Sequence, residues 1–205
     1  GISLFLVPKF LPRADGSPGE RNGVTCSALE HKMGIKASAT CQMSFDDATG
    51  WLVGEPHKGM RAMFTMMNEA RLGVGLQGYA AAEAAYQNAV DYARDRLQGR
   101  AVTGAENKAG PADPIIVHPD VRRMLLAQKA YAEGAMALCL YAAKLVDEAD
   151  TAGGADAANA ALLLDVLTPI VKSWPSQYGP IANDLAIQVL GGSGYTRDYD
   201  VEQFY

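Results

Sequence analysis

From about Gly59 onward, apolar residues recur at three- and four-residue steps, and this period constrains the fold of most of the chain. Side chains at that spacing share one face of an α-helix, because a helix turns once every 3.6 residues. The face begins with Met60, Met63, Phe64, Met67, Arg71 and Val74. The pattern continues to about Arg96, so we expect a first long helix over residues 59–96.

Three glycines, Gly73, Gly75 and Gly78, lie inside this helical pattern. Each costs about 1 kcal/mol relative to alanine in a helix interior. Three together indicate close packing against another helix or a kink, and close packing is sufficient to explain them.

Three further helices follow a polar loop over residues 98–118. Pro119 suits the first turn of a helix that ends near Asp150. A third helix is expected from about residue 156 to 171, and a fourth over 181–190, because Pro175 and Pro180 interrupt the pattern between them. Long helices joined by short turns predict a bundle.

The first 52 residues have the character of β-structure. Short apolar or alternating runs at 2–7, 24–32 and 40–45 predict strands. Residues 12–23 are rich in glycine, proline and charge, so we expect an exposed turn there. The predicted fold class is therefore mainly α, a helical bundle preceded by a few strands.

Composition excludes several classes of function. The net charge of the 205 residues is −5, which argues against non-specific nucleic-acid binding. The three histidines, His31, His57 and His118, have no metal-ligand spacing, so no metal site is expected. The most apolar predicted helix is interrupted by Asp165 and Pro169, so no membrane span is expected either.

The three cysteines, Cys26, Cys41 and Cys139, are widely spaced and form no CxxC pair. We interpret them as buried thiols of a reducing compartment rather than as a disulfide framework, which favours a cytoplasmic location.

The most specific motif is the segment 188–195, with the sequence QVLGGSGY. Glycine has no Cβ, so a flat ring or a phosphate can approach the main chain closely at such a helix end. The alternative is structural, because glycine commonly ends helices as a cap.

Two pairs of polar residues are candidates for ligand contacts. Arg96 and Arg100 lie four residues apart at the end of the first helix, where they either favour the helix dipole or clamp a phosphate. Asn68 and Arg71 share a helix face. They form either a buried hydrogen-bonded network or a contact with a polar ligand arm.

These motifs, taken in order, resemble the acyl-CoA dehydrogenase family. The resemblance covers the whole chain and includes the segments KMGIKAS at 32–38, GEPHKGM at 54–60, NEAR at 68–71 and YARDR at 92–96, followed by 188–195. The sequences of residues 66–72 and of the loop at 114–121 resemble those of the larger subgroup, which includes 3-methylmercaptopropionyl-CoA dehydrogenase-like enzymes. The resemblance implies that residues 1–54 end a middle β-domain and that residues 55–205 belong to a C-terminal four-helix-type domain.

The resemblance also implies ligands for named residues. Six residues would contact the FAD of a partner subunit, with Arg96 at the pyrophosphate: Arg96, Gln98, His118, Gln188, Gly191 and Gly192. Asn68 and Arg71 would lie on the acyl-CoA side. The implied protein is a homo-oligomer, a dimer or tetramer, that passes electrons to an electron-transfer flavoprotein.

The implied reaction is α,β-dehydrogenation of an acyl-CoA thioester. The family's catalytic glutamate follows the segment that ends at Tyr205, and Glu202 matches a non-catalytic glutamate. We therefore expect a fragment that has no catalytic residue and is inactive alone. The alternatives are an acyl-CoA oxidase, a nitroalkane oxidase or the flavoprotein induced by DNA alkylation, all of the same fold, or a helical oligomerisation module without catalysis.

Overall fold

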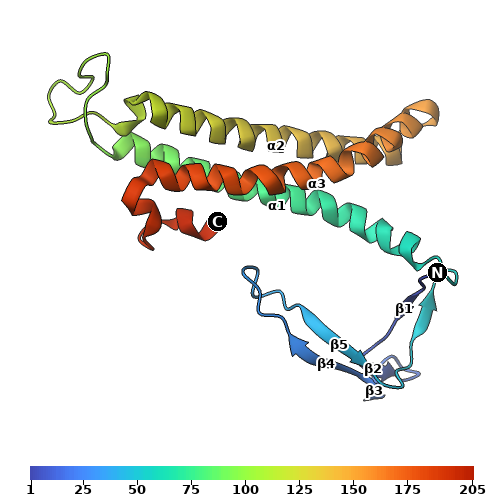
Figure 1. Cartoon of the computed structure of the whole chain (residues 1–205). Coiled ribbons are helices and arrows are strands. Elements are labelled where there is room, and N and C mark those ends of the chain that lie inside the picture. Colours follow the sequence, from blue (N-terminus) through green and yellow to red (C-terminus); the bar gives the residue numbers. More distant parts are fainter. The chain divides into compact units, whose positions relative to one another are not determined.

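The computed structural model describes residues 1–205, which form two compact units, Gly1–Met67 and Asn68–Tyr205. Most residues lie in helices, as expected (Figure 1). The strands are β1 (Leu4–Leu6), β2 (Phe10–Pro12), β3 (Pro18–Arg21), β4 (Val24–Leu29), β5 (Cys41–Phe45) and β6 (Trp51–Val53). The helices are α1 (Gly59–Asp95), η1 (Ile115–Val117), α2 (Pro119–Thr151), α3 (Gly154–Leu190), η2 (Gly191–Tyr195) and η3 (Asp200–Phe204).

The strands of the first unit form three antiparallel pairs, β1 with β6, β2 with β3, and β4 with β5. The pair β4–β5 confirms the two strands expected there. The prediction of an exposed turn over residues 12–23 was wrong in part, because β2 and β3 form a hairpin around Gly16. Gly16 has a φ of 81°, and the Asp15 carboxylate accepts hydrogen bonds from the Ser17 amide and hydroxyl at 3.0 and 2.7 Å.

The cysteines are not buried, contrary to the prediction. Cys26 and Cys41 are exposed on β4 and β5, and Cys139 is half-buried on α2. The strand pair β4–β5 exposes most of its residues on both faces, so apolar side chains there do not imply a core. A hydrogen bond with the Cys26 thiol raises the pKa of Cys41, which disfavours its thiolate form.

The helices α1, α2 and α3 form the second unit from Asn68 onward, and alanine dominates their contacts. Ala85, Ala89 and Ala93 on α1 are fully buried, as are Ala182 and Ala186 on α3. Each group repeats every four residues, so the small side chains line up on one face of each helix. The alanine faces bring the C-terminal half of α1 and that of α3 close together around Ile187 and Leu190, which complete the core.

The prediction of separate third and fourth helices was wrong, because α3 continues through Pro169, Pro175 and Pro180. A proline in a helix removes one amide hydrogen bond, and Pro175 leaves the carbonyl of Val171 without its usual partner. That carbonyl faces Gly75 of α1, where an added Cβ would lie only 2.4 Å from the oxygen. Packing against α1 therefore holds the helix together at the position where its own ladder is interrupted.

The glycines of α1 explain this contact. A Cβ at Gly75 would clash with Val171, and a Cβ at Gly78 would lie 2.9 Å from the backbone of Pro175. Close packing is thus confirmed at these two positions. Gly73 differs, since nothing lies within 4 Å of its Cβ position.

The segment Gly154–Tyr195, which comprises α3 and η2, is long and apolar enough to cross a membrane by length and composition. The expectation that Asp165 and Pro169 interrupt the apolar stretch too much for such a length was therefore wrong. One such helix is weak evidence for a span, because core helices pass the same test.

Candidate functional site

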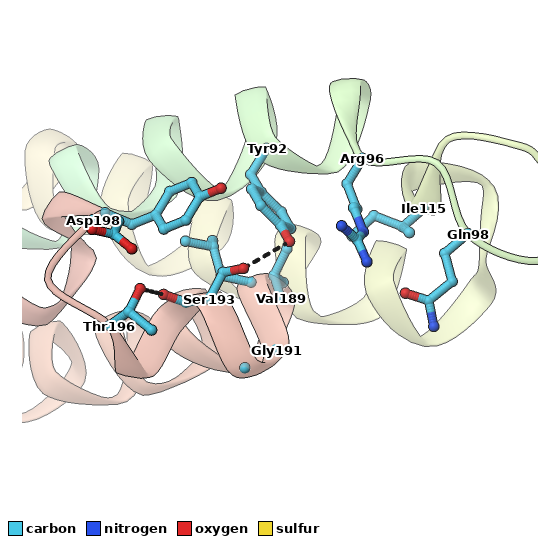
Figure 2. Close-up of a pocket in the computed structure, with 12 residues that line it drawn as sticks. Tyr92, Arg96, Gln98, Ile115, Val189, Gly191, Ser193, Thr196 and Asp198 are labelled. Carbon is cyan, nitrogen blue, oxygen red and sulfur yellow. Dashed lines mark hydrogen bonds between the residues drawn. The ribbon is translucent and has the colours of Figure 1, made fainter.

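A cavity of about 550 Å³ lies where α1 and α3 end (Figure 2). Three separate segments contribute its walls. They are the end of α1 with Arg96 and Gln98 just beyond it, one residue of η1, and the last residues of α3 with the turn that follows them. The lining residues are Tyr92, Arg96, Gln98, Ile115, Val189, Leu190, Gly191, Gly192, Ser193, Thr196, Asp198 and Tyr199. Four of the six residues that the sequence assigns to FAD are therefore in one place, and the other two are not among the lining.

Arg96 supplies the positive charge of this cavity. Its backbone is fixed on both sides, because its amide donates to the Tyr92 carbonyl at 2.8 Å and its carbonyl accepts from the Ile115 amide at 2.8 Å. Its guanidinium has no hydrogen bond or ion pair within the chain. A fixed, unpaired guanidinium at a cavity is suited to bind the oxygens of an anion such as a phosphate.

The three glycines of the turn serve three different purposes. Gly191 has a φ of 58° and ends α3, so the helix-cap interpretation is correct for this residue. A Cβ at Gly194 would lie 2.4 Å from the Ile187 carbonyl oxygen, so this glycine lets η2 fold back onto α3. Nothing within 4 Å of the Cβ position requires glycine at Gly192, which lines the cavity. Its bare backbone leaves room for a ligand.

Hydroxyl and aromatic groups form part of the cavity lining. The Tyr92 hydroxyl donates to the Ser193 hydroxyl at 3.3 Å, and the Tyr92 ring packs edge-on against Tyr199 with 5.5 Å between centroids. Figure 2 shows Arg96 and Gln98 at one side and Asp198 at the other, so the cavity has a cationic and an anionic end. Ser193 belongs to the glycine motif, but Asp198 and Tyr199 were not predicted from the sequence; their position just after the motif is the signal that could have found them.

The loop between α1 and α2, which carries Gln98, is held by hydrogen bonds to the carboxylate of Asp113. Asp113 is fully buried, and its carboxylate accepts from the Ala101 amide at 2.9 Å and the Asn107 amide at 2.6 Å. Arg100 pairs with the same carboxylate at 3.3 Å and donates to the Gly110 carbonyl. The alternative of an Arg96–Arg100 phosphate clamp is therefore wrong, because Arg100 is committed to the loop.

These hydrogen bonds lower the pKa of Asp113 from 3.8 to about 2, with the Ala101 and Asn107 amides as the main cause. A carboxyl whose pKa is depressed in the folded state stabilises that state above its unfolded pKa and ceases to do so as the pH falls through the folded pKa. We therefore expect the melting temperatures of wild type and Asp113→Asn to differ most above about pH 4 and to converge between about pH 4 and pH 2. Thermal unfolding by circular dichroism across this range tests the prediction, and a constant difference would contradict it.

His118 and Gln188 lie beside the cavity rather than in it. The His118 Nε2 is 2.7 Å from the Gln98 carbonyl oxygen, and His118 directly precedes α2. Gln188 donates from Nε2 to the Tyr195 hydroxyl at 2.8 Å. Both side chains thus brace a segment that lines the cavity.

Asn68 and Arg71 lie together on α1, as their spacing predicts. The Arg71 Nη1 donates to the Asn68 Oδ1 at 3.4 Å. Asn68 is exposed, so the alternative of a buried network does not describe the pair in this chain. Neither residue lines the cavity. No group of three or more His, Cys, Asp or Glu side chains is placed to hold a metal ion.

Comparison with known proteins identifies the family. Residues 57–205 match the family model of the acyl-CoA dehydrogenase C-terminal domain. The chain therefore belongs to the acyl-CoA dehydrogenase family.

Two curated relatives align with the whole of this chain at 45% identity. They are a broad-specificity linear acyl-CoA dehydrogenase of Mycobacterium tuberculosis and a 3-methylmercaptopropionyl-CoA dehydrogenase of Ruegeria pomeroyi. The chain spans 34% of the length of each, so it corresponds to about a third of these proteins.

Solved structures show the same fold. Caenorhabditis elegans ACDH-11, solved in complex with C11-CoA, matches at a TM-score of 0.79 and 21% identity, and the match covers 98% of this chain and 31% of that one. Butyryl-CoA dehydrogenase from Megasphaera elsdenii matches 89% of the chain and 42% of its own at a TM-score of 0.69 and 26% identity. The expected family and fold class are thus confirmed.

Proposed function

We propose that the protein is an FAD-dependent acyl-CoA dehydrogenase and that this chain supplies one wall of its flavin site. The observation that carries the proposal is the cavity whose lining includes both the unpaired guanidinium of Arg96 and the open backbone of Gly191 and Gly192. A pyrophosphate needs such a combination, since guanidinium groups and bare main chain both bind phosphate oxygens closely. Membership of the acyl-CoA dehydrogenase family favours FAD as the ligand that supplies this pyrophosphate.

Each residue has a proposed role in this site. Arg96 binds the FAD pyrophosphate, Gln98 donates beside it, and Gly191 and Gly192 allow the cofactor to approach the main chain. His118 and Gln188, which the resemblance places at FAD, hold Gln98 and the glycine turn in position. Asn68 and Arg71 are proposed to face the acyl-CoA.

The proposed reaction is α,β-dehydrogenation of an acyl-CoA thioester, for which bound FAD supplies the acceptor of the β-hydride. The residues of this chain bind and orient the cofactor, and none is proposed as the base that removes the α-proton. Glu202, in η3, has no proposed catalytic role. An electron-transfer flavoprotein is the proposed electron acceptor.

The visible absorption spectrum of the purified whole protein tests this function. A flavin band that bleaches anaerobically on addition of a mixture of straight-chain acyl-CoA thioesters is the expected result. Reoxidation by an electron-transfer flavoprotein without rapid oxygen consumption is expected of a dehydrogenase, whereas rapid oxygen consumption would indicate an oxidase of the same fold. Absence of bound flavin after reconstitution with FAD would contradict the proposal.

Exposed apolar side chains on α2 and α3 favour assembly with a second copy. Leu126 and Leu140 on α2 are 65% and 62% exposed, and Leu162 and Val166 on α3 are 68% and 58% exposed. Exposed apolar surface of this kind marks interaction sites. We propose a homo-oligomer whose partner subunit provides the FAD bound at the cavity, and a strictly monomeric protein in light scattering would contradict it.

Gly192 offers a test that separates binding from folding. Gly192→Ala places a methyl group in space that a ligand would occupy, so we expect FAD affinity to fall about tenfold with little change in melting temperature. The matched control is Gly191→Ala, which forces a side chain into a positive-φ conformation at a cost of about 1–3 kcal/mol. Equal losses of stability in the two variants would contradict this assignment.

A further inference from the structure

A fully buried carboxylate, that of Asp113, lies in the loop between α1 and α2 and outside the cavity lining. Its two oxygens accept from the backbone amides of Ala101 and Asn107 and from Arg100. A buried carboxylate is unfavourable unless such partners surround it. Asp113 therefore gathers residues 100–113 around one anionic centre.

The backbone of Asp113 connects this centre to the cavity. The Gln98 amide donates to the Asp113 carbonyl at 2.9 Å, and the Asp113 amide donates to the Gly99 carbonyl at 3.0 Å. Two residues farther along, the Ile115 amide donates to the Arg96 carbonyl at 2.8 Å. The segment that carries Arg96 and Gln98 is thus paired with the segment that Asp113 fixes.

We propose that Asp113 is a positioning residue for the cofactor site: its buried carboxylate fixes the loop, and the paired backbone then sets Arg96 and Gln98 at the spacing that a pyrophosphate requires. This inference rests on the proposed flavin function. It adds a residue that touches no ligand but determines where the phosphate-binding side chains lie.

Electrostatics allows a clear test. Asp113 carries a negative charge near an anion site, so its removal alone should strengthen phosphate binding through the Coulomb term. A positioning role predicts the opposite, because loss of the carboxylate frees the loop and disperses Arg96 and Gln98. The sign of the change therefore separates the two effects.

The experiment compares Asp113→Asn with Asp120→Asn in the purified whole protein. Asp120 is exposed in the first turn of α2, so its substitution removes one negative charge from the same unit without removing a hydrogen bond of the loop. We expect Asp113→Asn to weaken the binding of both FAD and ADP at least about tenfold, measured well below its melting temperature, whereas Asp120→Asn leaves binding unchanged or slightly tighter. Unchanged affinity with a lowered melting temperature would show a purely structural role and overturn the proposal.

A double-substitution cycle adds a readout that stability alone does not move. If Asp113 acts through Arg96, then Asp113→Asn should cause little further loss in an Arg96→Gln background, and fully additive losses would overturn the proposal. Should Asp113→Asn fail to fold, Asn107→Ala weakens the same loop by removing the bonds to Gly110 and Ala112, and the same pattern is expected at smaller size. A wild-type protein that binds neither FAD nor ADP would overturn the proposed function as well, whereas normal wild-type binding with unaffected variants overturns only the role of Asp113.

Discussion

Gly75→Ala is expected to destabilise the helical unit strongly through a single added methyl group. The added Cβ would lie 2.4 Å from the Val171 carbonyl oxygen and 3.1 Å from its carbonyl carbon, both atoms of the backbone of α3. Backbone cannot rotate away as a side chain does, so α1 and α3 must separate. Overpacking of a core costs about 1–3 kcal/mol, and we expect the upper part of this range. For a chain of this size the melting temperature should fall by roughly 4–10 °C.

Gly73→Ala is the matched control, because it adds the same methyl group two residues earlier on the same helix. Nothing lies within 4 Å of that Cβ position, so the substitution should only improve helix propensity, by about 0.5–1 kcal/mol. The two variants are therefore expected to shift the melting temperature in opposite directions. Thermal unfolding followed by circular dichroism measures both, and shifts of the same sign would contradict the packing argument.

Sequence periodicity predicted the helix bounds correctly where the bounds depend on local pattern. It did not predict the continuous helix α3, which depends on packing between helices. The bounds of α1 and α2 follow from spacing and from Pro119, so they were predicted to within a few residues. The break expected at Pro175 does not occur, because the carbonyl that this proline leaves free packs against Gly75 on another helix. Contacts between helices cannot be predicted from a local pattern, and here such a contact keeps α3 continuous through Pro175.

The candidate site shows the same division. Local sequence identified Arg96 and the glycine turn, but Arg96 and Arg100 look equivalent at the end of a helix. The difference between them arises from Asp113, which binds Arg100 and leaves Arg96 unpaired. Asp113 lies 13 residues beyond Arg100 in a polar loop, and nothing in the sequence marks it as buried.

Arg96→Gln is expected to cause the largest loss of cofactor binding. Hydrogen bonds to charged groups contribute about 1.5–3 kcal/mol, which corresponds to a roughly 10- to 100-fold weaker affinity for FAD. Arg96 makes no side-chain hydrogen bond or ion pair within the chain, so the fold should retain its melting temperature. Binding measured by flavin fluorescence, together with thermal unfolding, tests both parts.

Arg94→Gln is the control that isolates the position of the charge. Arg94 lies two residues earlier on α1 and is 65% exposed. It lines a different cavity, with Tyr86 and Leu126, so its loss should leave FAD affinity nearly unchanged. Added salt should weaken binding by wild type more than by Arg96→Gln, because screening acts on a charge pair that the variant lacks. Equal losses in the two arginine variants would mean that the net charge of the surface, and not the guanidinium at the end of α1, attracts the cofactor.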